Sequence, residues 1–291
     1  MNLELVLEAQ SDVGESPVWD TDNGGLWWVD LLRGELHYWD GRGNWTKRPS
    51  IGQSLGFVVP FDRGRFVAGT RDGIGVLEAD GHFDLIASVE PDRPDFRMND
   101  GKCDPQGRLW AGTMSDATHT DGRLYRMDAN WYVELIAEGL GVPNGLGWSR
   151  DGRLLYLADT GRGRLEWWLF DPERGAPVKL INTVQFSVPE GGPDGLAVDD
   201  EDCAWVCMWG GHSVRRYAPS GDLLQVIEIP AFNAASCAFG GDDWQDLYIT
   251  TARYGLTDQQ IQKWPLSGSV FRCRLDVKGR PADTFKGQGP R

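Results

Sequence analysis

The chain has 291 residues and a formal net charge of −14, with a sequence pI near 4.7. Such an acidic composition lacks the basic surface with which proteins neutralise phosphates, which excludes nucleic acid as a partner. The N-terminal segment MNLELVLEAQSD has no basic region followed by an apolar stretch, and no segment approaches roughly 18 consecutive apolar residues. We therefore predict a cytoplasmic protein that does not interact with a membrane.

Six similar segments follow one another along the chain, each pairing a Gly- or Asp-led apolar strand with a second strand that ends at a turn. They begin at Gly24, Gly64, Gly107, Gly152, Asp202 and Asp246. Successive starts are 40, 43, 45, 50 and 44 residues apart, which suits four short strands with their turns. This period is typical of a propeller blade, whereas a large β-sandwich would share the composition without the repeat. We predict an all-β fold, a six-bladed β-propeller with four antiparallel strands per blade.

The repeats leave no room for an internal linker. The 38 Gly and 16 Pro are spread along the predicted blades, so residues 1–280 are expected to form a single propeller domain. Most of the 14 Trp and 11 Phe would fill the space between wedge-shaped blades. Residues 281–291 are rich in Gly, Pro and charge and are predicted to form a flexible C-terminal tail.

Polar side chains recur at one position of the predicted first strands. They are Glu15 in GESPVWD, Asn99 in NDGKCD, Asn144 in NGLGWS and Asp194 in DGLAVD, with Asp100 beside them. In equivalent strands these side chains would converge near the propeller axis. One Asn or Asp before Gly is an ordinary turn residue, but like charges packed at a narrow axis need a compensating cation. Ligands that are all oxygen fit a hard or borderline divalent cation.

The predicted second strands run antiparallel to the first and end on the same face of the ring. Their last residues would form a rim around the polar cluster: Asp30, Arg71, Met114 with Ser115, Asp159, Trp209 and Arg253. Loops on one face of a rigid scaffold commonly select the substrate. We therefore expect the rim, with loops 115–122 and 210–213, to surround the substrate.

Motifs for other kinds of catalytic site are missing from the sequence. There is no G-x-S-x-G elbow, no H-E-x-x-H and no Gly-Lys-Ser/Thr phosphate loop. The five cysteines have no C-x-x-C spacing and are interpreted as buried thiols. The four histidines, His37, His82, His119 and His212, fall on separate blades and are interpreted as surface strand, turn or loop residues.

A family resemblance runs over nearly the whole chain. It is carried by GESPVWD, RMNDGKCDPQGRLWAGTM, VPNGLGWSRDGRLLYLADT and GGPDGLAVDDED, and the motifs resemble, in the same order, those of the SMP-30/gluconolactonase/LRE family, which includes regucalcin and sugar-acid lactonases. The resemblance implies a six-bladed propeller. It implies that Glu15, Asn144 and Asp194 hold one divalent cation, which is Ca, Zn, Mn, Mg or Fe(II). It also implies that Arg97 and Asn99 contact the substrate and that Asp194 acts as the base.

The chain departs from the family pattern in one loop. Members of the regucalcin type carry a glutamate that binds sugar hydroxyls after the GTM motif, whereas the loop here reads SDATHTDGR. Asp116 or Asp121 is the candidate to bind the substrate in its place. The identity of the sugar stays open for this reason.

The predicted function is that of a metal-dependent hydrolase that opens a small lactone, such as gluconolactone or xylonolactone. The cation would polarise the carbonyl, water would attack it, and Asp194 would accept the proton of that water. Two alternatives remain. The same cation could act on another ester or a phosphorus electrophile, or the propeller could bind calcium or another ligand without catalysis. A monomer or a small homo-oligomer is expected.

Overall fold

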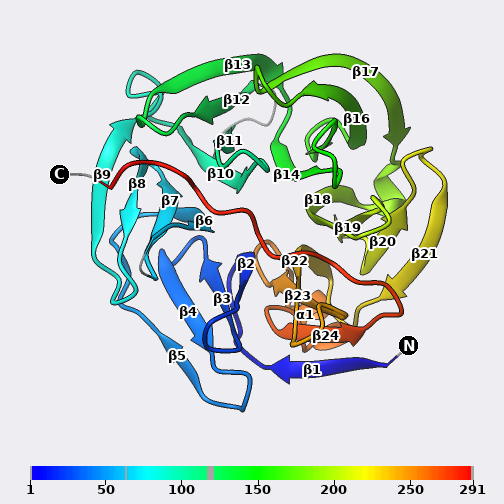
Figure 1. Cartoon of the computed structure of the whole chain (residues 1–291). Helices are drawn as coiled ribbons and strands as arrows, with labels where there is room; N and C mark the ends of the chain where they lie inside the picture. Colours follow the sequence, from blue (N-terminus) through cyan, green and yellow to red (C-terminus); the bar gives the residue numbers. More distant parts are fainter. Residues whose placement is uncertain (1, 63, 117–120, 290–291) are drawn as a thin grey trace.

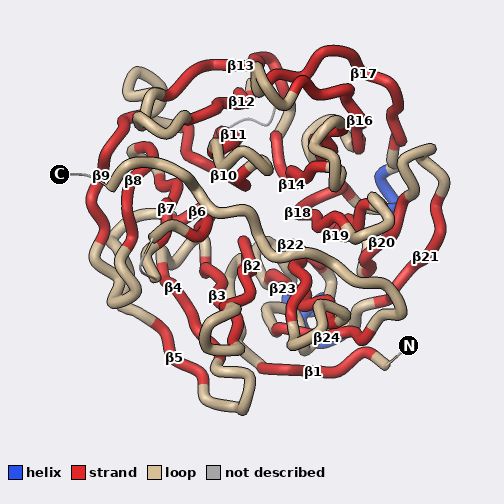
Figure 2. Tube along the Cα trace, viewed as in Figure 1, coloured by secondary structure: helices blue, strands red, loops and turns tan. Residues whose placement is uncertain are grey.

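The computed structural model of the chain describes residues 2–62, 64–116 and 121–289. These residues form six four-stranded antiparallel sheets arranged as a ring (Figure 1), which confirms the predicted six-bladed propeller. Helix in the described part is limited to the 3₁₀ turn η1 (Val188–Glu190) and to α1 (Asp258–Lys263) (Figure 2). No helix among the described residues is both long enough and apolar enough to cross a membrane.

Each blade runs from a first strand at the centre of the ring to a fourth strand at its outer edge. Blades 1 and 2 contain β2 (Gly14–Asp20), β3 (Gly25–Asp30), β4 (Glu35–Trp39) and β5 (Trp45–Lys47), then β6 (Leu55–Pro60), β7 (Phe66–Thr70), β8 (Gly73–Leu77) and β9 (Phe83–Ser88). Blades 3 and 4 contain β10 (Phe96–Cys103), β11 (Leu109–Ser115), β12 (Gly122–Met127) and β13 (Val133–Leu140), then β14 (Pro143–Trp148), β15 (Leu154–Asp159), β16 (Arg164–Asp171) and β17 (Ala176–Gln185). Blade 5 contains β18 (Gly192–Val198), β19 (Ala204–Trp209), β20 (Ser213–Tyr217) and β21 (Leu223–Glu228).

The N-terminal strand pairs with the last strand of the chain in blade 6, which closes the ring. Its strands are β22 (Asn233–Gly240), β23 (Asp246–Ala252), β24 (Val270–Arg274) and the N-terminal β1 (Leu3–Leu7). Strand β1 pairs antiparallel with β24, with Leu3 opposite Cys273 and Leu5 opposite Phe271. Because the first and last strands hydrogen-bond to each other, the sheet edge that an open ring would expose is covered.

One hydrogen bond between a tryptophan and an aspartate recurs in blades 3 and 5. Trp110 Nε1 donates to Asp104 Oδ2 at 3.1 Å, and Trp205 Nε1 donates to Asp199 Oδ2 at 3.0 Å. Each acceptor directly follows the first strand of its blade and begins the turn to the second strand, and Trp110, Trp205 and both aspartates are buried. The indole therefore fills the wedge between blades while its N–H satisfies a buried carboxylate.

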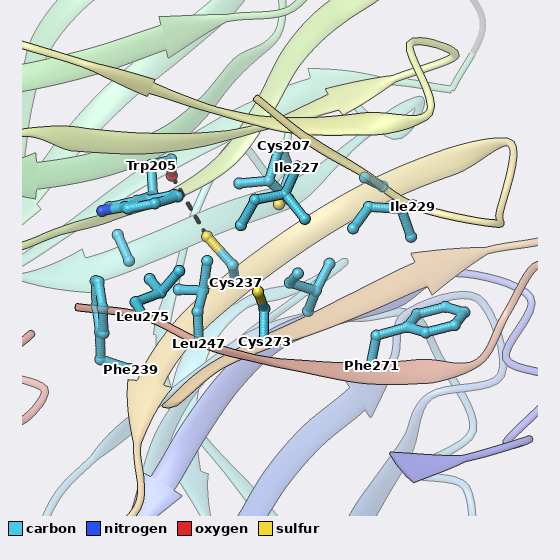
Figure 3. Close-up of a cluster of buried hydrophobic side chains, with 14 of the residues drawn as sticks. Trp205, Cys207, Ile227, Ile229, Cys237, Phe239, Leu247, Phe271, Cys273 and Leu275 are labelled. Atoms are coloured by element: carbon cyan, nitrogen blue, oxygen red, sulfur yellow. Dashed lines mark hydrogen bonds between the residues drawn. The ribbon is translucent and has the colours of Figure 1, made fainter. Parts of the chain in front are cut away.

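The core between blades 5 and 6 is apolar and contains three of the cysteines. Cys207, Cys237 and Cys273 lie among Trp205, Phe271 and aliphatic side chains (Figure 3). The Cys237 thiol contacts the Trp205 carbonyl oxygen at 3.3 Å. All five cysteines fall within the described residues, are buried and are free, as the spacing predicted.

The C-terminal segment 275–289 crosses the ring from blade 6 to blades 2 and 3, in front of its centre in Figure 1. The backbone N–H of Phe285 donates to the Pro60 carbonyl at 2.9 Å, and that of Lys286 donates to the Gly107 carbonyl at 3.0 Å. Phe285 is 2% exposed. We name residues 275–289 the C-terminal strap. The flexibility predicted for residues 281–291 stays a prediction, and residues 290–291 lie outside the described part.

Candidate active site

A β-bulge recurs near the beginning of every first strand. The pairing of the first with the second strand shifts register between Glu15 and Val18, Met98 and Gly101, Pro143 and Leu146, and Pro193 and Leu196. The same shift occurs in blades 2 and 6, at Leu55–Phe57 and Ala234–Ser236. A bulge inserts an unpaired residue and re-aims its side chain. Each of the six blades thus has a bulge whose side chain is redirected at the same end of the propeller axis. We call this end the upper end.

The polar residues predicted from the sequence lie at these shifts in four of the blades. Glu15 borders the bulge of blade 1, and Asn99, Asn144 and Asp194 lie within those of blades 3, 4 and 5. The corresponding residues of blades 2 and 6 are Gly56 and Ala235. Because the blades on either side of blade 1 have no polar side chain at this position, the polar set is asymmetric around the axis.

Small residues allow the first strands to approach each other closely at this level. A Cβ added to Gly145 would overlap the Asp194 carbonyl oxygen, and one added to Gly195 would overlap the Ser236 hydroxyl. The glycine that follows each of these bulge residues therefore permits the contact between blades. The contact brings the Asn144 side chain against the Asp194 carboxylate.

Three carboxyl groups are buried together at the upper end. Glu15 and Asp100 are each 7% exposed, and Asp194 is 2% exposed. Burial raises the pKa of Glu15 well above its usual range, and the charges of Asp194 and Asp100 raise this pKa further. Burial followed by the charge of Asp100 likewise raises the pKa of Asp194, against hydrogen bonds from Asn144 and from the Gly195 N–H. These carboxyl groups therefore share a site with too little positive charge to stabilise their ionised forms.

The Asn144 amide has its donor satisfied and its acceptor free. Its Nδ2 donates to Asp194 Oδ1 and, at 3.1 Å, to Thr160 Oγ1. Thr160 in turn donates to the Pro193 carbonyl oxygen at 2.6 Å, which fixes its hydroxyl as the acceptor for Asn144. Asn144 Oδ1 is buried and has no hydrogen-bond partner among the described residues. A buried carbonyl oxygen of this kind costs free energy unless a donor or a cation meets it.

These groups form a donor set that fits a divalent cation. Two carboxylates and an unpartnered amide oxygen are ligands for hard cations such as Ca²⁺ and are also used by Mg²⁺ and Mn²⁺. Across the described ranges, no three His, Cys, Asp or Glu side chains converge on one point. The candidate set is therefore Glu15, Asp194 and Asn144, with the amide as its third protein ligand.

Asn99 occupies the same position in blade 3 but is engaged differently. Its Oδ1 accepts a hydrogen bond from Arg97 Nη1 at 3.1 Å, and its Nδ2 donates to the Pro143 carbonyl at 3.2 Å. Since both ends of this amide are used, Asn99 lacks the free oxygen that Asn144 has. The hydrogen bonding separates Asn99 from the candidate cation ligands.

Arg97 is 7% exposed and is held by acceptors on several sides. Besides Asn99, its Nη1 donates to the Met98 carbonyl at 3.1 Å, its Nε donates to Asp116 Oδ1 at 3.0 Å and its Nη2 lies 3.1 Å from the Met114 sulfur. Burial lowers the pKa of Arg97, while the charges of Asp116 and Glu15 act in the opposite direction. Arg97 therefore lies between the buried carboxyl cluster and the rim.

Of the two aspartates predicted in the loop after β11, only Asp116 contacts Arg97. Its Oδ2 accepts a 2.5 Å bond from Arg71 Nη2. Burial alone would raise the pKa of Asp116, but the bonds and charges of Arg71 and Arg97 outweigh it and lower this pKa. Asp121 is 58% exposed and pairs with Arg93 at 2.7 Å instead. Residues 117–120, between them, lie outside the described residues.

Thr160 and Asp100 take part in this site although the sequence did not single out a role for either. Thr160 orients the Asn144 amide, and its signal would have been a hydroxyl directly after the last residue of a predicted second strand. Asp100 shares the blade 3 bulge with Asn99 and adds negative charge to the cluster. His212, expected to be a solvated loop residue, stacks on Trp264 with 4.3 Å between ring centroids.

A cavity of about 510 Å³ lies at the opposite, lower end of the axis. Its walls are the later halves of the first strands, such as 58–60 and 197–198, and its outer side is formed by residues 280–286 of the strap. Ser16 and Asp100 also line it, so its inner end reaches the underside of the carboxyl cluster. The strap separates this cavity from the outer surface of the lower face.

Comparison with known proteins connects this geometry to one family. The family model for the SMP-30/Gluconolactonase/LRE-like region matches residues 13–253. The 6-deoxy-6-sulfogluconolactonase of Pseudomonas putida is 35% identical, covering 98% of this chain and 99% of that protein, and regucalcin of Danio rerio is 33% identical, covering 99% of each. The crystal structure of a calcium-binding protein, regucalcin, from Agrobacterium tumefaciens superimposes with a TM-score of 0.89 at 30% identity, covering 97% of this chain and 96% of that one.

Proposed function

The chain belongs to the SMP-30/gluconolactonase/LRE-like family, and from this membership we propose that it is a lactonase that hydrolyses a sugar aldonolactone. The name of the Pseudomonas putida relative supports this choice of substrate class. The observation that carries the proposal is the buried Asn144 Oδ1 without a partner, beside two carboxyl groups and next to Arg97. Burying these polar and charged groups costs free energy, so they would not be expected in a part of the protein that only stabilises the fold.

One divalent cation is assigned to Glu15, Asn144 and Asp194. It would offset the mutual repulsion of the two carboxylates and satisfy the free amide oxygen, so the donor set and the electrostatics agree. When bound, such a cation would polarise the lactone carbonyl and stabilise the negative charge that develops on its oxygen. Ca, Zn, Mn, Mg and Fe(II) all accept these ligands and are compared in the experiment below.

Asp194 is assigned the role of general base. The bond from Asn144 Nδ2 to its Oδ1 holds the carboxylate in one orientation. Water would attack the ester carbon while Asp194 accepts its proton, the ring C–O bond would break, and the departing oxygen would take up a proton to become a hydroxyl. The product is a hydroxy acid whose carboxyl group is ionised at neutral pH. One proton is therefore released for each lactone opened.

Arg97 and Asn99 are assigned to the substrate. The bonds of Arg97 to Asp116 and Asn99 hold its guanidinium in place before the substrate arrives. A fixed donor costs no ordering entropy when the lactone binds, which favours one orientation of the ring in the site. Asp116 acts through Arg97 in this proposal and is a positioning residue.

Proton release in a pH-stat tests the proposal directly. Chelator-treated protein is assayed with each of the five metals and with gluconolactone, xylonolactone and 6-deoxy-6-sulfogluconolactone, each corrected for spontaneous hydrolysis. We expect metal-dependent release with at least one lactone. Asp194→Asn should retain the cation by calorimetry and lose about 100-fold or more in kcat. Asp222→Asn, in an outer turn of the same blade where the carboxylate bonds only Ser220 among the described residues, is the matched control.

Three results would oppose the proposal. Hydrolysis of no lactone above the buffer rate with any metal would reject the lactonase assignment and favour a phosphorus ester or a binding function. Full activity after metal removal would reject the cation. Full activity of Asp194→Asn would reject its role as base while leaving the lactonase assignment standing.

A further inference from the structure

The rim of blades 2 and 3 places two guanidinium groups on one carboxylate. Asp116 accepts from Arg97 through Oδ1 at 3.0 Å and from Arg71 through Oδ2 at 2.5 Å. Arg71 directly follows β7, and Asp116 directly follows β11, so both end the second strand of their blade. We name Arg71, Asp116 and Arg97 the rim triad. It carries an excess of one positive charge in a chain whose formal net charge is −14.

The two arginines of the triad differ in how completely their donors are used. Arg97 has four partners, and its side chain is only 8% exposed. The Arg71 side chain is 39% exposed, and its hydrogen bonds within the described ranges are to Asp116 and, at 3.1 Å, to the Pro94 carbonyl. A guanidinium has five N–H donors. Arg71 therefore has donors left for a ligand at the rim, while Arg97 is largely satisfied.

The order of these groups runs outward from the buried carboxyl cluster. Arg97 is close enough to Glu15 for the charge of that carboxyl group to act on it, and its side chain is 8% exposed. Asp116 and Arg71, which follow in this chain of contacts, have side chains that are 42% and 39% exposed. A lactone whose ester reaches the cluster would extend its distal end toward Asp116 and Arg71. Under the proposed function the charges of Glu15 and Asp194 are engaged by the cation, which leaves the excess charge of the triad for the substrate.

We propose that the lactone hydrolysed by this protein carries an anionic substituent at its distal end, and that Arg71 binds it. A sulfonate, phosphate or carboxylate group would accept from the free donors of Arg71, as carboxylates and phosphates do from exposed arginines. The inference rests on the proposed function and makes Arg71 a specificity-determining residue. An Arg71 that only ties blade 2 to blade 3 through Asp116 and Pro94 would contribute to stability and not to the choice of substrate.

A matched pair of lactones tests the inference. Gluconolactone and 6-deoxy-6-sulfogluconolactone share a ring and differ in distal charge. We expect kcat/KM to be higher for the sulfonated lactone and the ratio of the two values to fall about tenfold or more in Arg71→Gln, because a charge-assisted bond is lost. Added NaCl should lower kcat/KM for the sulfonated lactone more than for gluconolactone.

Arg33→Gln is the matched control for this variant. Arg33 follows the second strand of blade 1, its side chain is 37% exposed and it pairs with Asp12 at 2.8 Å, so it resembles Arg71 in position, exposure and ion pairing. The ratio of kcat/KM values should be unchanged in Arg33→Gln. A second readout is calorimetric binding of the hydrolysed acids, gluconate and 6-deoxy-6-sulfogluconate. Arg71→Gln should weaken the sulfonated acid about tenfold relative to gluconate.

The outcomes separate this inference from the proposed function. Turnover of gluconolactone with no preference for the sulfonated lactone and no change of ratio in Arg71→Gln would overturn the inference and leave the lactonase standing. Turnover of neither lactone would count against the proposed function. The binding of the two acids would then still test whether Arg71 recognises the anionic substituent. Equal weakening of both acids, with a lowered melting temperature relative to Arg33→Gln, would show that Arg71 is structural and overturn the inference.

Discussion

The two ends of the propeller axis are built from the same six strands by opposite means. At the upper end the strands begin with bulges that bury Glu15, Asp194 and an amide oxygen without a partner. At the lower end they are crossed by the strap, whose backbone bonds Pro60 and Gly107 and whose Phe285 is buried. The buried polar groups of the upper end lower the stability of the fold but can take part in catalysis. The lower end has its backbone hydrogen bonds formed and its aromatic side chain packed. The comparison suggests that the strap and the ring closure offset the cost of the site.

Substitution at the lower end should give the largest loss of stability. Phe285 packs against Trp131 and Phe61, with ring centroids 5.0 and 5.8 Å away. Phe285→Ala would leave a cavity there and lower the free energy of unfolding by about 4 kcal/mol. Lactonase activity per folded molecule should be retained, since Phe285 lies outside the site. Urea unfolding and a pH-stat assay measure the two effects.

Val188→Ala is the control for this change, because Val188 is 95% exposed and should shift the unfolding free energy by less than about 0.5 kcal/mol. If Phe285→Ala lost activity in proportion to stability at a temperature where it is fully folded, the two ends would not be separable. The comparison would then be wrong, and the strap would belong to the site.

A buried histidine outside both ends of the axis, His37 in β4, should make the stability of the fold depend on pH. His37 is 1% exposed, and burial lowers its pKa from 6.5 to about 4, against the nearby charge of Glu35 and with a smaller contribution from the charge of Lys47. Trp45 Nε1 donates to His37 Nδ1 at 3.3 Å, and His37 Nε2 lies 3.2 Å from Glu35 Oε2. A neutral ring with its proton on Nε2 can donate to Glu35 and accept from Trp45. In the protonated ring Nδ1 would also carry a proton, which would face the N–H of Trp45.

Because the pKa of His37 is lower in the folded than in the unfolded state, the unfolded state takes up the proton first as the pH falls. This stability is fully present above pH 6.5 and is lost as the pH falls toward about 4, where the loss reaches about 3 kcal/mol. Urea unfolding of the wild type and of His37→Gln between pH 7 and 4.5 measures it. The variant should lack this component, and His82→Gln, whose side chain is 67% exposed, should retain it. Equal slopes in wild type and His37→Gln would contradict the prediction.

Two glycines on one strand test how local the upper end is. In β14, a Cβ at Gly145 would overlap the Asp194 backbone, whereas a Cβ at Gly147, nearer the lower end, would meet the Val198 and Leu196 side chains at 2.6 and 2.8 Å. Gly145→Ala should displace Asp194 and lower kcat about 100-fold. Gly147→Ala should lower stability with a smaller loss of kcat, because side chains can move where a backbone cannot. Equal losses of kcat would mean that the strand moves as one body.

Much of this arrangement could be predicted from the sequence, because the repeat is carried by every blade. The spacing of the segments predicted six blades, the recurring polar residue predicted a site on the axis, and the resemblance to the SMP-30 family is confirmed. Residue type and strand position alone do not distinguish Asn99 from Asn144, and only the family resemblance assigned one amide to the substrate and the other to the cation. In the structure they differ because Arg97 donates a hydrogen bond to the Asn99 amide oxygen, whereas the Asn144 amide oxygen has no donor among the described residues. The strap also gives no periodic signal, and Phe285 is a single aromatic residue in a polar segment.

That difference between two amides leads to the smallest and most specific expectation. A cation that binds only the folded state at ten times its Kd should raise the unfolding free energy by about 1.4 kcal/mol, and calcium and zinc titrations monitored by thermal melting measure the shift. Asn144→Ala removes the free Oδ1 and should abolish the shift. Asn99→Ala removes an oxygen that already accepts from Arg97 and should keep it. A shift lost in both variants would show that the whole upper ring binds the cation, and the distinction drawn from the hydrogen bonds would fail. A shift lost only in Asn144→Ala would locate the cation on the blade 4 side of the ring, where Asn144 meets Asp194, and would leave Asn99 to the substrate.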